Sequence, residues 1–97
     1  MTYDDFILTI ENDEQPPNFP LYLQALWYDA KDDWQKAHAL IDSLDDKNSC
    51  WVHAYLHRKE GDIANADYWY RRANKQRYSA SLQKEWQDIT IQLLGES

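Results

Sequence analysis

The segment from 61 to 73 constrains the fold of this chain more than any other. It carries a glycine followed by acidic, aliphatic, small, aromatic and small residues, at Gly61, Asp62, Ile63, Ala66, Tyr70 and Ala73. Glycine is the residue that best tolerates the left-handed conformation that ends a helix, and an aspartate can cap the helix that follows. The small residues then let the two helices approach closely. We therefore predict a helical hairpin in which residues 50–60 form the first helix.

A weaker copy of this pattern lies 29 residues upstream. The copy consists of Ala25, Asp33, Trp34, Ala37 and Ile41, which match Ala54, Asp62, Ile63, Ala66 and Tyr70. Asp32 takes the place of Gly61, and aspartate enters the left-handed region more often than most residues do. Two hairpins predict a helical-repeat scaffold, and such scaffolds usually hold partners.

The whole chain is predicted to form a single all-α domain of five to six helices. A short helix and a Pro-rich connector containing Pro16 and Pro17 occupy residues 1–19. The first hairpin spans 20–46 and the second spans 50–75, with a turn at Asn74. A last helix at 79–94 is expected to cap the open end of the stack. The predicted core residues on the helix stripes are Trp34, Ala37, Ile41, Ala54, Ala66, Trp69, Tyr70 and Ala73.

The hairpin residues resemble a known repeat. Gly61, Asp62, Ile63, Ala66, Tyr70 and Ala73 resemble the second half of a tetratricopeptide repeat, and residues 68–73 are similar to its Sel1-like variant. Residues 51–62, 65–66 and 68–73 together also resemble a family of short bacterial proteins of unassigned function. The resemblance covers about residues 21–75. It implies compact helical hairpins and a concave groove along the first helix of each hairpin.

Charge is distributed unevenly along the chain. The net charge is −7, and residues 1–46 carry eleven acidic residues against Lys31 and Lys36. Six basic residues instead gather in twenty residues around the second hairpin, at Arg58, Lys59, Arg71, Arg72, Lys75 and Arg77. The overall field disfavours nucleic acid and anionic membranes, whereas the local cluster can hold a carboxylate. A solvated surface is the alternative interpretation of the same cluster.

The setting predicted from composition is the cytoplasm. Cys50 is the single cysteine, so no intramolecular disulfide can form. Residues 2–5 place acids where a signal peptide would be basic, and no apolar run approaches the length of a membrane span.

The groove implied by the resemblance is aromatic and basic. Trp51, Tyr55, Arg58 and Lys59 would line it from the first helix of the second hairpin, and the second helix would add a further set, Asn65, Tyr68 and Arg72. Aromatic walls with cationic ends suit an acidic or C-terminal peptide segment. Alternatively, the two aromatic side chains pack within the fold and the cations only reach past them to solvent.

A second candidate site lies on the same helix. Cys50, His53, His57 and Glu60 follow helical spacing and share one face. A metal site there would need a ligand from another helix, and His38 is the remaining imidazole. Hydrogen-bonded packing of these rings is the favoured interpretation, and no cofactor or enzymatic activity is predicted, because no oxyanion donor accompanies Cys50.

The leading hypothesis is therefore a non-enzymatic interaction module for an acidic segment. The alternatives are a small-ligand or metal-binding protein built on His53 and His57, and a structural subunit of a homo-oligomer. The oligomeric state itself is not encoded in any motif of the sequence.

Overall fold

A computed structural model describes residues 1–15 and 18–95. These residues form six α-helices and no strand: α1 (Tyr3–Glu11), α2 (Leu21–Ala30), α3 (Trp34–Ile41), α4 (Lys47–Glu60), α5 (Ile63–Arg72) and α6 (Leu82–Gly95). The prediction of an all-α fold is confirmed. Pro16 and Pro17 of the predicted connector lie outside the described residues.

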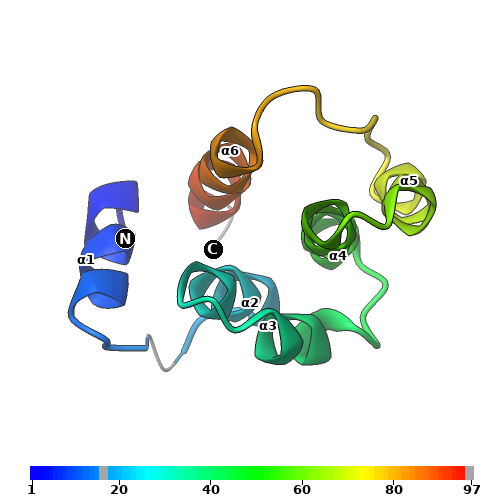
Figure 1. The fold of residues 1–97 in the computed structure, drawn as a ribbon. Coiled ribbons are helices and arrows are strands. Elements are labelled where there is room, and N and C mark those ends of the chain that lie inside the picture. Colours follow the sequence, from blue (N-terminus) through cyan, green and yellow to red (C-terminus); the bar gives the residue numbers. More distant parts are fainter. Residues whose placement is uncertain (16–17, 96–97) are drawn as a thin grey trace.

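The two predicted hairpins are α2–α3 and α4–α5. Their turns have the same backbone conformation. Gly61 ends α4 in the left-handed conformation with φ of 91°, and the Asp62 side chain accepts a hydrogen bond from the Asn65 amide. Asp32 adopts the same conformation after α2, with φ of 62°, and Asp33 caps α3. The two turns place each pair of helices side by side (Figure 1).

Several boundaries differ from the prediction by a few residues. Helix α4 begins at Lys47 rather than 50, because the Asp46 side chain accepts a hydrogen bond from the Ser49 amide and starts the helix earlier. Helix α3 ends at Ile41. Helix α6 begins after Ser81, whose hydroxyl accepts a hydrogen bond from the Lys84 amide.

The predicted core is largely buried. Six of its members are inaccessible or nearly so: Ala37, Ile41, Ala54, Ala66, Tyr70 and Ala73. Trp34 and Trp69 are only partly buried, because each lies at the edge of the α3–α4–α5 layer. Trp34 donates its indole hydrogen to the Leu56 carbonyl, and Trp69 stacks on His53. Ile63, the aliphatic residue of the hairpin pattern, is 37% exposed.

Helix α6 covers the first helix of each hairpin. It lies between α1 and α4 and packs on α2 and α4 (Figure 1). Ile89 and Leu93 are fully buried there, and Trp86 donates to the Leu26 carbonyl at 3.1 Å. The face of α4 that the resemblance assigned to an open groove is therefore covered by α6.

Candidate functional site

The aromatic walls of the predicted groove are interior. Trp51 and Tyr55 are 4% and 3% exposed. The Trp51 indole nitrogen donates to Glu85 Oε2 at 3.3 Å, and the Tyr55 hydroxyl donates to Asp29 Oδ2 at 2.7 Å. Burial and the acceptor carboxylate of Asp29 raise the pKa of Tyr55 far above its usual value. Both side chains thus join α4 to its neighbours rather than facing an open groove.

The cations beside them are engaged by the same carboxylates. Arg58 Nη1 lies 2.8 Å from Glu85 Oε1, and its Nη2 donates to the Ala80 carbonyl. Lys59 Nζ lies 2.8 Å from Asp29 Oδ1. Glu85 is fully buried and also accepts the Tyr70 hydroxyl at 2.6 Å, so it joins α4, α5 and α6. These two cations therefore stabilise the fold.

Sequence reasoning missed both carboxylates, although each carried a signal. Asp29 lies in a helix that is apolar on almost every side, and Glu85 follows Leu82 by three residues on the apolar stripe of α6. An acidic residue in such a position needs a partner when it is buried. Arg58 and Lys59, on the facing helix, are those partners.

The predicted residues on α5 remain at the surface. Tyr68 is 45% exposed, and Arg72 lies over the rings of Tyr68 and Trp69 at 5.8 and 5.1 Å from the centroids. Arg72 also donates to the Tyr68 hydroxyl, which raises the pKa of the guanidinium. Asn65 lies on the same face but turns its amide towards His57 Nε2, 3.3 Å away.

Three of the cations that pair with no described carboxylate cluster at the end of α5. Five of the ten lysines and arginines form ion pairs with described residues: Lys31, Arg58, Lys59, Arg77 and Lys84. Among the five others, Arg71, Arg72 and Lys75 fall within five residues of sequence. We call Tyr68, Arg71, Arg72 and Lys75 the basic α5 surface; Lys75 is half-buried and the other three side chains are exposed. A shallow hollow of about 530 Å³ adjoins it, lined in part by Arg71, Lys75 and Arg77.

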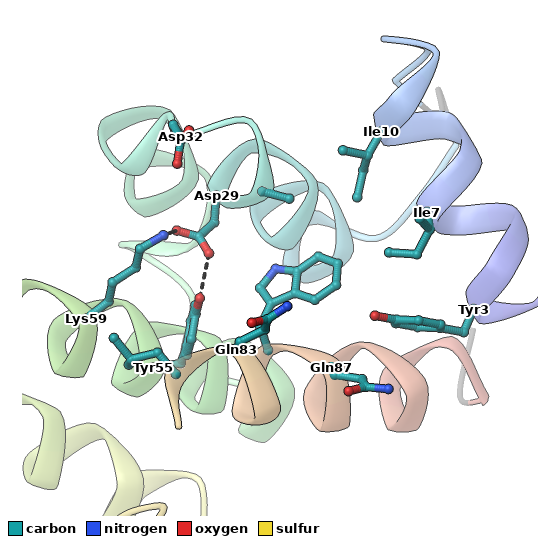
Figure 2. A pocket seen from close by; sticks show the side chains of 12 residues that line it. Tyr3, Ile7, Ile10, Asp29, Asp32, Tyr55, Lys59, Gln83 and Gln87 are labelled. Carbon is teal, nitrogen blue, oxygen red and sulfur yellow. Dashed lines mark hydrogen bonds and ion pairs between the residues drawn. The ribbon is translucent and has the colours of Figure 1, made fainter. Parts of the chain in front are cut away.

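A second hollow, of about 520 Å³, lies between α1 and α6. Figure 2 shows Tyr3, Ile7 and Ile10 of α1 along one side of it. Trp86 and Leu82 of α6 line it as well, and the Asp29, Tyr55 and Lys59 contacts lie at one end. We call this hollow the α1–α6 groove. Its lining is mainly apolar, and its charged end carries Asp29 and Asp32 against one lysine.

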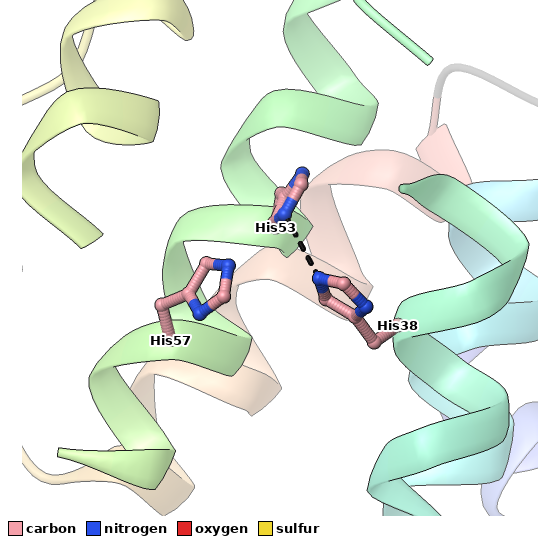
Figure 3. Close-up of side chains that lie close together, drawn as sticks. All are labelled: His38, His53 and His57. Carbon is pink, nitrogen blue, oxygen red and sulfur yellow. Dashed lines mark hydrogen bonds between the residues drawn. The ribbon is translucent and has the colours of Figure 1, made fainter. Parts of the chain in front are cut away.

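All three histidines of the chain lie together between α3 and α4. His38 Nε2 is 3.1 Å from His53 Nε2, and one nitrogen from each of His38, His53 and His57 lies within 4.8 Å of the others. Figure 3 shows a ring nitrogen of each residue turned towards the space between the rings. We call these residues the histidine cluster. Sequence reasoning named its members but did not place His38 against the other two.

The histidine cluster has both polar and aromatic neighbours. His57 Nδ1 lies 2.6 Å from Glu60 Oε1, and Nδ1 of the buried His53 has no hydrogen-bond partner among the described residues. Burial and the neighbouring rings of His57 and His38 lower the pKa of His53 to about 4. Trp34 stacks on His38 and Trp69 on His53, at centroid distances of 4.9 and 3.9 Å. His53 is therefore a neutral ring at physiological pH.

Cys50 stands apart from this cluster. Its side chain is fully buried, and burial raises the pKa of the thiol, since the partly compensating charge of Arg72 is the weaker influence. A protonated, inaccessible thiol is a poor nucleophile and a poor metal ligand.

The comparisons with known proteins give no match, whether to a family model, to a curated protein or to a solved structure. None of the helices in the described ranges combines the length and apolar character that crossing a bilayer requires.

Proposed function

We propose that this chain is a protein-interaction module that binds an acidic peptide segment through the basic α5 surface. The observation that carries the proposal is the cluster of Arg71, Arg72 and Lys75, which form no ion pair with a described residue, beside the exposed ring of Tyr68. The remainder of the chain is strongly acidic, so this surface is a local exception.

The arrangement of Arg72 supports recognition of a carboxylate. Its guanidinium lies over two aromatic rings and donates one N–H to the Tyr68 hydroxyl. A guanidinium fixed in this way loses less side-chain entropy on binding, and its other N–H groups match a carboxylate in two-point geometry. Lys75, whose amine lies 4.2 Å from the Trp51 ring centroid, adds a second cation nearby.

The proposal is for binding rather than catalysis, in the cytoplasm, by a scaffold of tetratricopeptide type. Cys50, the thiol considered as a nucleophile, is fully buried, and a free thiol suits a reducing compartment. The α4–α5 hairpin with its left-handed Gly61 supports the kinship to that repeat.

A peptide array tests the proposed function. Each acidic peptide is paired with a copy in which glutamine or asparagine replaces the acids, and binding is read at low and moderate salt. We expect preference for the acidic copies, weakened by salt because exposed charges are screened within about 10 Å at 0.1 M. Arg72→Glu should remove that preference.

Lys36→Glu is the matched control. Lys36 also forms no ion pair with a described residue, but it lies on α3, and both variants have the same net charge. If the two variants lose binding equally, the response is to total charge and the basic α5 surface is not the binding site.

The α1–α6 groove supports a second candidate function, the binding of a short apolar peptide segment that has a basic end. The groove is lined by half-buried apolar side chains, and its acidic end would repel an acidic segment. On the same array, Ile7→Glu should abolish binding of such peptides, while Leu8→Glu, outside the groove on the same helix, should leave it unchanged. Equal effects of the two variants would exclude the groove.

A further inference from the structure

We propose that the histidine cluster is a binding site for a divalent transition metal, with Zn²⁺ as its representative ion, ligated by His38, His53 and His57. This inference goes beyond peptide binding and does not depend on it. It rests on four features of the cluster: the distances, the origin of the ligands, the partner of the outer nitrogen of His57, and the aromatic enclosure.

The first feature is distance. Zinc binds histidine nitrogen at about 2.0–2.1 Å, so two nitrogens on one tetrahedral ion are about 3.3–3.4 Å apart. His38 Nε2 and His53 Nε2 are 3.1 Å apart. The third nitrogen lies within 4.8 Å of both, so one nitrogen of each ring borders the same space.

The second feature is that the ligands come from two helices. His53 and His57 are four residues apart on α4, with rings stacked at 4.8 Å, and a straight helix can offer no third ligand in tetrahedral geometry. His38 comes from α3, across the interface between the hairpins. The site exists only when both hairpins are folded.

The third feature is the partner of the outer nitrogen of His57. Its Nδ1 hydrogen points to Glu60 Oε1 at 2.6 Å, which leaves Nε2 as the acceptor that faces the other rings (Figure 3). A carboxylate on the outer nitrogen is the usual partner of a metal-bound histidine, because it fixes the tautomer and raises ligand basicity. Asn65 Nδ2, now 3.3 Å from that Nε2, would have to turn aside.

The fourth feature is enclosure. Trp34 and Trp69 stack on His38 and His53 and restrict the rotation of both rings. His38 is 23% exposed in its side chain, and Asp42 Oδ1 lies 3.7 Å from its Nε2. Entry is therefore from the side of His38, where Asp42 or a water molecule can complete the coordination. A three-histidine set without a thiolate is suited to Zn²⁺, Co²⁺, Ni²⁺ or Cu²⁺ rather than to Ca²⁺ or Mg²⁺.

The experiment uses the full chain without a histidine tag, stripped of metal by a chelator and dialysed. Zn²⁺ is titrated by calorimetry, and Co²⁺ is titrated by visible absorption, which reports tetrahedral coordination. We expect one ion per chain, an intense Co²⁺ band and quenching of tryptophan fluorescence by Cu²⁺. A folded protein that takes up neither Zn²⁺ nor Co²⁺ would overturn the proposal.

Two variants separate ligation from packing. His38→Gln should weaken Zn²⁺ binding by more than about 100-fold, and Glu60→Gln by the ~10–100-fold typical of a residue that positions a ligand. His57, Glu60 and Asp62 form an alternative, more exposed set of ligands. If His38→Gln keeps the wild-type affinity, the ion binds that set and the three-histidine site is wrong.

A further measurement covers the case in which His38→Gln does not fold. In the wild-type chain, ring resonances of all three histidines should shift together at one equivalent of Zn²⁺. A shift confined to His57 would contradict the proposal.

Discussion

Two sets of aromatic and basic side chains, one on α4 and one on α5, look alike in the sequence and differ in the structure. On α4, Trp51 is buried, and Arg58 and Lys59 are paired with Glu85 and Asp29. On α5, Tyr68 and its neighbouring cations face solvent and meet no carboxylate within the described part of the chain. The difference is supplied by α2 and α6, whose buried acids pair with the cations of α4. A basic cluster therefore indicates a binding surface only after the internal acids have been accounted for.

The sharpest way to break this comparison is to remove the acid that satisfies α4. Glu85→Ala leaves Arg58, Trp51 and Tyr70 without their buried acceptor, so we expect a loss of about 3–5 kcal/mol in the free energy of unfolding. Urea denaturation measures it. Asp88→Ala, one turn further along α6 and partly exposed, should cost much less. Equal losses would mean that Glu85 does not hold α6 to α4.

Acidification tests the opposite face of α4, where the buried His53 forms no ion pair with a described carboxylate. The pKa of His53 is lowered to about 4 from the ordinary 6.5, so between these values the unfolded chain binds more protons than the folded chain. Stability should therefore fall as the pH drops from about 6.5 to 4, by at most about 1.4 kcal/mol per pH unit.

Urea midpoints across this range, with a chelator present, provide the measurement. His53→Gln should flatten the slope if the variant folds. A wild-type midpoint that stays constant between these pH values would contradict the neutral, buried state of His53.

A smaller difference is expected between two tryptophans, one from each set. Trp51 is almost fully buried, and its replacement by alanine should cost about 3–5 kcal/mol. Trp69 is partly buried, so Trp69→Ala should cost about 2 kcal/mol, chiefly through lost stacking on His53. Thermal unfolding of the two variants gives the order. A larger loss for Trp69 would reverse the assignment of interior and surface.

Most of the fold could be predicted from the sequence, because the signals for a helical hairpin are local. The left-handed residues Gly61 and Asp32, the capping residues Asp62 and Asp33 and the helical stripes act within a few positions of one another. The Asp46 cap was local too and was overlooked. The start of α4 was consequently predicted at residue 50 rather than at Lys47.

The candidate sites were less predictable, because their partners are distant in sequence. Glu85 reaches Arg58 across 27 residues, and His38 reaches His53 across 15. Helical periodicity indicated which helix face carried each of these residues. It did not indicate which other helix would pack on that face. The position of α6 decided that, and the one local signal, Glu85 on the apolar stripe of this helix, does not identify the partner helix.

The most direct test of the comparison is a matched pair of arginine substitutions, Arg58→Gln and Arg72→Gln, followed by urea denaturation. Each removes one positive charge and keeps a shorter, polar side chain. We predict that Arg58→Gln lowers the urea midpoint strongly, because Glu85 is left buried with a lost partner, and that Arg72→Gln leaves the midpoint close to the wild-type value. Equal midpoints for the two variants, or a larger drop for Arg72→Gln, would contradict the division into structural cations on α4 and free cations on α5.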